Sequence, residues 1–187
     1  MEPQLGMQTD PPVDDSLQSR MIRAARLDPT LYDEVKADPG ALSQAVVIVL
    51  LSAVATGIGF GQGDLQLIAL GMSFALVGWW ITAYLTWFIG TRFLPEPETR
   101  ATPAELLRAI GFANSPGILR MVAAVPELAV IVIVATTIWT LCATVIAIRQ
   151  GLSYRSTARA VGVYVAIQLV LIPLVLLFAS PENPQVP

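Results

Sequence analysis

The residues that could do chemistry in this chain are few, and the types that most enzymes rely on are scarce. The chain has no histidine and a single cysteine, Cys142, which lies inside an apolar run. Haem, zinc and nucleophile–histidine chemistry therefore lack their usual ligands and bases, and no intrachain disulfide can form. Every Asp and Glu lies outside the apolar runs or at their ends. We expect no catalytic residue, no cofactor and no metal site.

Three polar side chains nevertheless lie inside apolar segments: Asn114, Arg120 and Gln168. Coupled transport of protons or cations generally uses acidic residues within the membrane, and this chain places none there. Amides and hydroxyls could still line a path for a neutral solute. A later segment carries Thr137, Thr140 and Thr144 on one helical face, with Thr136 alongside. Threonine hydroxyls in membrane helices usually bond to their own backbone or a neighbouring helix, which favours packing over a polar path.

A group of aromatic residues offers a similar choice between a binding site and packing. The group consists of Trp79, Trp80, Tyr84, Trp87 and Phe88. It could form a box for a cofactor or ligand. Aromatic residues at a membrane interface more commonly anchor and pack helices, and we favour that interpretation.

The elements that must position these residues are membrane helices. Of the 187 residues, 55% are hydrophobic and 13% are charged, whereas about 25% are charged in soluble domains. Four uncharged runs, at 39–63, 65–91, 128–148 and 160–181, are each long enough for a helix to span hydrocarbon, which takes roughly 20 residues. We predict an all-α, polytopic membrane helix bundle. The net charge of −3 and the dispersed basic residues argue against a nucleic-acid partner.

A fifth segment, residues 104–125, decides the sidedness of the rest. If it crosses, every Lys and Arg except Arg108 and Arg120 falls on one side of the membrane, as the positive-inside tendency favours. These two arginines would then lie near opposite ends of the crossing, where long stems can extend toward the head groups. Pro116 should break this middle helix. A re-entrant pair of half-helices, broken at 115–117, is the alternative.

We therefore predict five crossings, with the N terminus in the cytoplasm and the C terminus outside the cell membrane. The bundle occupies 39–179, with spans at about 40–60, 65–90, 104–125, 127–148 and 157–178. The polar, Pro-containing tails at 1–15 and 180–187 are predicted to be disordered, because they bury too little apolar surface to offset the entropy of ordering.

Residues 16–38 are predicted to form a cytoplasmic amphipathic region. Ser16 can cap a helix, and Asp28-Pro29 and Asp38-Pro39 signal two further helix starts. Basic and apolar side chains occupy different faces of the first helix; they are Arg20, Arg23 and Arg26 with Leu17 and Met21. These residues are candidates for contact with the anionic membrane surface or with a partner. A solvated helix tucked under the bundle is the equally weighted alternative.

A run of glycines, Gly57, Gly59, Gly61 and Gly63, ends the first apolar segment. It contains two interleaved GxxxG spacings, which allow helices to approach closely in lipid. Glycines at every second position near a helix end more often indicate a loose turn, and we favour the turn.

The sequence Gly111-Phe112-Ala113-Asn114-Ser115-Pro116 in the middle segment resembles a motif of the Yip (Ypt-interacting protein) family. Arg26-Leu27-Asp28-Pro29, followed by Tyr32 and Glu34, is similar to the N-terminal signature of its bacterial branch. The likeness covers about residues 20–178, with Gly111, Phe112, Ala113 and Pro116 as motif residues. The eukaryotic motif Asp-Leu-Tyr-Gly has no clear counterpart, so the resemblance does not imply binding of Rab-type GTPases.

This resemblance implies a non-enzymatic adaptor or organiser in a bacterial inner membrane. The expected partners are the lipid bilayer and a membrane or cytoplasmic protein, with a homo-oligomer as an open alternative. A small transporter or channel for a neutral solute is the second hypothesis. An intramembrane enzyme ranks third, because the chain lacks histidine and paired intramembrane carboxylates.

Overall fold

The apolar runs fold as helices, since a helix satisfies all of its backbone groups internally, as lipid requires. A computed structural model describes residues 15–61 and 64–179, and every regular element within these ranges is helical. The order is α1 (Leu17–Ala25), α2 (Pro29–Ala37), α3 (Ala41–Gly61), α4 (Leu65–Arg92), α5 (Pro103–Phe112), η1 (Ser115–Ala124), α6 (Pro126–Gly151) and α7 (Thr157–Ala179). The predicted all-α helix bundle is confirmed. The two predicted disordered tails lie almost wholly outside the described residues.

Helix starts follow the capping signals of the sequence. The Asp28 side chain accepts a hydrogen bond from the Thr30 amide at the start of α2, and Asp64 does the same for Gln66 in α4. At the start of α5, the Thr102 hydroxyl accepts from the Glu105 amide at 3.3 Å, and the Glu105 carboxylate accepts from the Thr102 amide at 2.7 Å. This reciprocal capping box fixes where the middle segment begins.

Three helices are long and apolar enough to cross a membrane, judged by length and composition: α3, α4 and α6. α7 adds a shorter apolar stretch, Thr157–Pro173. α5 and η1 are each only 10 residues long. Five crossings require α7 to cross and α5 and η1 to cross together, in addition to these three helices. Five crossings stay a prediction.

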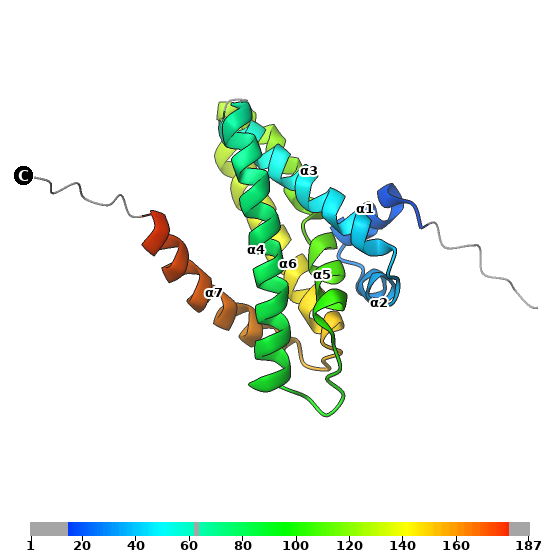
Figure 1. Cartoon of the computed structure of the whole chain (residues 1–187). Helices are drawn as coiled ribbons and strands as arrows, with labels where there is room; N and C mark the ends of the chain where they lie inside the picture. The colour runs from blue at the N-terminus through cyan, green and yellow to red at the C-terminus, as the bar shows by residue number, and fades with distance from the viewer. Residues whose placement is uncertain (1–14, 62–63, 180–187) are drawn as a thin grey trace, which may run out of the picture.

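α5 and η1 continue in one direction along α3 and do not fold back on each other (Figure 1). Gly111 of α5 lies against Ala45 near the start of α3, and Gly117 of η1 lies against Ser52 further along. Near the end of α3, Gly59 contacts the carbonyl of Arg120. The two halves thus follow α3 along most of its length, a path that differs from a re-entrant hairpin. α6 then returns through the bundle, and α7 diverges from it (Figure 1).

The predicted break of the middle helix is confirmed, and its cause is Pro116. Proline has no N–H to donate to the carbonyl of Phe112, four residues earlier. That carbonyl instead accepts a hydrogen bond from the Ser115 hydroxyl at 2.7 Å. The Gly117 amide then donates to the Asn114 carbonyl at 2.9 Å, and the chain continues as the 3₁₀ helix η1.

The turn predicted for the glycine run is wrong for its described part. α3 continues through Gly61, so Gly57 and Gly59 are helical. A Cβ atom at Gly57 would lie 2.6 Å from Ile68 Cγ1 of α4, and one at Gly59 would collide with the Arg120 carbonyl of η1. The glycines allow close helix contacts, the less favoured of the two interpretations. Gly63 lies outside the described residues.

Candidate functional site

The helices α1 and α2 form a cap that ion pairs join to the start of α3. Arg20 lies at its centre and is only 3% exposed. Its guanidinium donates to Asp38 at 2.9 Å, to Gln44 at 3.0 Å and to Asp15 at 3.0 Å. A further bond reaches Glu34 of α2 at 3.3 Å. One side chain therefore ties α1 to α2 and to the first long apolar helix.

Arg23 extends this network within the cap. It donates to Asp28 at 2.9 Å, to Glu34 at 2.7 Å and to Thr30 at 3.2 Å. The hydrogen bond from Arg20 lowers the pKa of Asp38 below its ordinary value, against the opposing effect of desolvation. At Asp28, burial alone would raise the pKa, but hydrogen bonds from Thr30 and Arg23 outweigh it and the pKa is lowered. Both carboxylates are therefore stabilised in their charged form by the folded cap.

A second set of contacts holds the end of α2 against the bundle. Arg108 of α5, 8% exposed, donates to the Val35 carbonyl at 3.0 Å and also to the Lys36 carbonyl. Lys36 donates to the Ser153 hydroxyl at 2.7 Å. The Arg108 guanidinium thus satisfies carbonyls that the C terminus of α2 leaves unpaired. The guanidinium reaches the end of α2, and its predicted extension toward the head groups stays a prediction.

The residues that were expected to meet a membrane surface or a partner divide into two groups. Arg20 and Arg23 pair with carboxylates of the same chain, and Leu17 and Met21 pack against the core. Arg26 is exposed. Contact with lipid or a partner stays a prediction for all five residues. The two paired arginines and the two packed apolar side chains already have partners within the chain.

The end of α1 reaches the side of α6. The Trp139 indole N–H donates to the Ala25 carbonyl at 2.7 Å. α1 therefore packs against the bundle, as in one of the two alternatives, and its outer face carries Ile22, which is 45% exposed. The cap is a folded part of the bundle with an exposed surface of its own.

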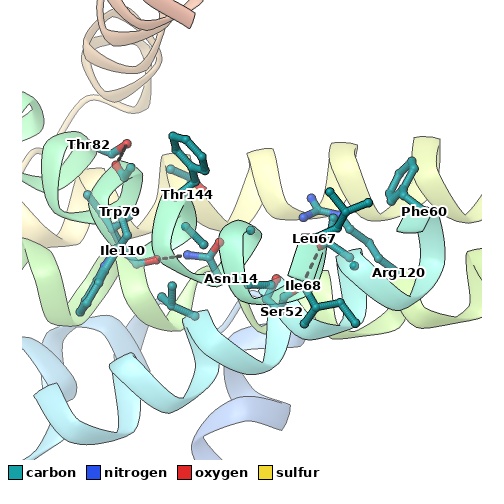
Figure 2. A pocket seen from close by; sticks show the side chains of 18 of the residues that line it. Ser52, Phe60, Leu67, Ile68, Trp79, Thr82, Ile110, Asn114, Arg120 and Thr144 are labelled. Carbon is teal, nitrogen blue, oxygen red and sulfur yellow. Dashed lines mark hydrogen bonds between the residues drawn. The ribbon is translucent and has the colours of Figure 1, made fainter. Parts of the chain in front are cut away.

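A cavity of about 780 Å³ lies on another part of the bundle, between α3, α4, α5–η1 and α7, with Thr144 of α6 also in its lining. All three intramembrane polar residues singled out from the sequence, Asn114, Arg120 and Gln168, line it. Figure 2 shows Asn114 donating to the Ile110 carbonyl, a bond of 3.0 Å, and Arg120 extending along the cavity. The sequence identified these residues singly, and the fold brings them to one cavity.

Arg120 is the charged residue of this cavity. A Cβ atom at Gly117 would lie 3.4 Å from Arg120 Nη1 and would collide with the Ser52 hydroxyl. The guanidinium therefore turns back toward Gly117 and Ser52, and the predicted extension toward the head groups stays a prediction. Among the described residues, no Asp or Glu lines the cavity, and the guanidinium has no hydrogen bond or ion pair.

Glycines that sequence reasoning missed open the cavity on its α4 side. A Cβ atom at Gly71 or Gly78 would meet nothing within 4 Å, and both residues line the cavity. Their seven-residue spacing places them on the same face of α4. This spacing was the signal in the sequence that could have indicated an open groove.

The aromatic and threonine groups mostly pack. Trp79 donates its indole N–H to the Leu107 carbonyl at 3.0 Å, and Trp80 stacks on Tyr84 with ring centroids 5.6 Å apart. The hydroxyls of Thr136 and Thr144 donate to carbonyls of their own helix. Trp79 and Thr144 also line the cavity, but neither group forms a separate site. In the described part of the chain, no three His, Cys, Asp or Glu side chains come together as metal ligands would.

The motif residues form the break between α5 and η1. Gly111 allows α5 to contact α3, since a Cβ atom there would lie 2.6 Å from that of Ala45. Phe112, the last residue of α5, and Ala113 are fully buried, and Pro116 lies in the first turn of η1. A functional role for these four residues stays a prediction.

The fold defines a polytopic membrane protein: a bundle of long apolar helices around a broken inner helix, with a folded N-terminal cap. The family model of the Yip1 domain matches residues 28–179. The match covers well over half of the chain, which therefore belongs to this family, and the resemblance to the Yip family noted from the sequence is confirmed. The likeness to its bacterial branch stays a prediction. No curated protein and no solved structure matches the chain significantly.

Proposed function

We propose that the protein is a non-enzymatic adaptor or organiser of a bacterial inner membrane, with its cap as the docking element on the cytoplasmic side. The observation that carries the proposal is the double attachment of the cap. Arg20 joins it to the start of α3, and Arg108 joins it to α5. A partner bound to such a cap would be held rigidly against the bundle.

The proposed sidedness rests on joint crossing by α5 and η1. Ten residues of α-helix and ten of 3₁₀ helix extend over about 35 Å, at rises of about 1.5 and 2.0 Å per residue. This length exceeds a hydrocarbon core of about 30 Å. If α5 and η1 cross together, the cap and the loops that follow α4 and α6 lie on one side of the membrane, and the C terminus lies on the other. The positive-inside tendency makes the first side the cytoplasm.

The outer face of the cap supplies the proposed docking surface, namely Ile22, Arg26 and Asp33, which are all exposed. Ile22 and the C-cap residue Arg26 lie one helical turn apart at the end of α1, and an apolar side chain beside a charge suits a protein partner. The occupant is a cytoplasmic or membrane protein, or a second copy of the chain.

The test is quantitative co-purification from membranes in mild detergent. We expect the double variant Ile22→Ser/Arg26→Gln to lose its specific partners severalfold while membrane insertion is unchanged. Arg100→Gln is the matched control, because it removes one exposed positive charge from the loop after α4 and leaves the cap intact. Equal recovery by parent and both variants would contradict docking at the cap.

A transporter or channel for a neutral solute is the second candidate, and the cavity is the observation that favours it. Its lining includes the amides of Asn114 and Gln168. A transport path runs through the bundle and does not need the outer face of the cap. Solute flux in proteoliposomes that survives Ile22→Ser/Arg26→Gln would favour transport, whereas loss of partners without any flux favours the adaptor.

A further inference from the structure

The position and the lining of the cavity that contains Arg120 suit a bound lipid. It lies along α3 and α4, two helices long and apolar enough to cross a membrane. α7 diverges from the bundle on this side (Figure 1) and contributes Tyr164 and Gln168 to the lining. Most of the other lining side chains are apolar. Acyl chains suit a groove of this composition, and they are the molecules that surround it in a bilayer.

A basic site within the groove is built from two chain segments that meet at Gly117. The Ser52 hydroxyl comes from α3 and the Arg120 guanidinium from η1, and both border the space that a Cβ atom at Gly117 would occupy. The absence of this Cβ atom brings a neutral donor and a cationic donor to one place. Figure 2 shows both side chains at the same cavity.

The charge of this basic site is not balanced within the cavity. Arg120 is the one charged residue among its lining side chains, and the described residues give the guanidinium no acidic partner. A cation at membrane depth is costly unless it is paired or hydrated. A guanidinium pairs well with a phosphate, since its planar N–H groups match two phosphate oxygens.

We propose that the cavity binds an anionic phospholipid. The phosphate lies against Arg120 and Ser52, and an acyl chain follows α4 past Gly71 and Gly78 toward Trp79. The charge of Arg120 selects the anionic head group, and the two glycines provide room for the chain. The proposal is independent of the docking function of the cap, because its residues lie on α3, α4 and η1.

Native mass spectrometry of the full chain tests the proposal, with phosphatidylglycerol and phosphatidylcholine of identical acyl chains as probes. We expect the parent to retain phosphatidylglycerol in preference to phosphatidylcholine. Arg120→Gln should weaken the binding of phosphatidylglycerol by at least about tenfold, a change of about 1.4 kcal/mol. It should weaken the binding of phosphatidylcholine less, because the choline cation already offsets the charge of that phosphate. Arg92→Gln, which removes an exposed cation at the end of α4, is the matched control and should bind as the parent does.

A second variant tests the space available to the acyl chain separately from the charge of Arg120. Gly78→Leu places a side chain in the open groove and keeps Arg120, so it should weaken binding of both lipids. The melting temperature without added lipid shows whether each variant is folded. Equal binding of phosphatidylglycerol by the parent and Arg120→Gln would overturn the proposal. A lipid-free dimer that excludes both probes would also overturn it, because a second copy would then cover the groove.

Discussion

The Ser115 hydroxyl donates a hydrogen bond of 2.7 Å to the Phe112 carbonyl, the group that an N–H at position 116 would otherwise reach. Pro116 cannot make that bond. Serine and proline at adjacent positions thus end one helix inside the bundle without leaving its carbonyl unpaired. The Ser-Pro pair of the motif therefore breaks the helix and keeps the buried carbonyl of Phe112 hydrogen-bonded.

This relationship predicts that the effect of Ser115→Ala on the free energy of unfolding depends on whether residue 116 is proline. Ser115→Ala should destabilise the protein by about 1–3 kcal/mol, because the buried Phe112 carbonyl loses its donor. In a Pro116→Ala background the same change should cost less, since the alanine backbone supplies the N–H that proline lacks. Unfolding in mixed micelles with increasing denaturing detergent measures both costs. Equal costs in the two backgrounds would contradict this account of the break.

The cap should depend on Arg20 far more than on its exposed neighbour. Arg20→Gln leaves Asp38 without its cation and Glu34 with Arg23 alone. We expect a loss of about 1–3 kcal/mol in the local stability of α1 and α2, moderated by the partial exposure of these carboxylates. Arg26→Gln is the control and should change stability by less than about 0.5 kcal/mol. Hydrogen exchange of the amides of α1 and α2 measures both. Similar protection in the two variants would show that the ion pairs do not hold the cap.

Acid should loosen the same cap. The pKa of Asp38 is lowered in the folded state by the hydrogen bond from Arg20, and the pKa of Asp28 is lowered by Thr30 and Arg23 against desolvation. A lowered carboxyl pKa adds stability that is present above the ordinary value of about 3.9 and is lost as the pH falls through the folded pKa.

We therefore expect the protection of α1 and α2, corrected for the intrinsic pH dependence of exchange, to fall as the pH drops below about 4. Protection in the middle of α3 should change less, because few carboxylates lie near it. Asp38→Asn should weaken the cap at neutral pH and reduce the effect of acid. A cap equally protected on both sides of this pH range would mean that the carboxylates contribute little.

Local signals in the sequence predicted much of the fold. Thr102 and Glu105 mark the start of α5 because a capping box depends on residues three positions apart, and Pro116 predicts the break because proline acts on its own turn. Likewise, the apolar runs predicted where the long helices lie. These features are readable because each depends on neighbours in the chain.

The contacts that build the cap could not be predicted in this way. Arg108 reaches the Val35 carbonyl across 73 positions, and Trp139 reaches Ala25 across 114. Such pairs follow from helix packing, and no local pattern specifies them. The inward turn of Arg120 has a similar origin, because it depends on how closely Ser52 approaches Gly117.

The central claim of this account is that α5 and η1 cross the membrane together. Cysteine labelling in intact cells tests it most directly, with Cys142→Ser as the background. Single cysteines replace Thr99, in the loop before α5, and Val125, directly after η1. We predict that a membrane-impermeant maleimide labels the cysteine at 125 in intact cells and the one at 99 only after the membrane is opened. Labelling of both positions from the same side would contradict the crossing and, with it, the proposed sidedness of the cap and the C terminus.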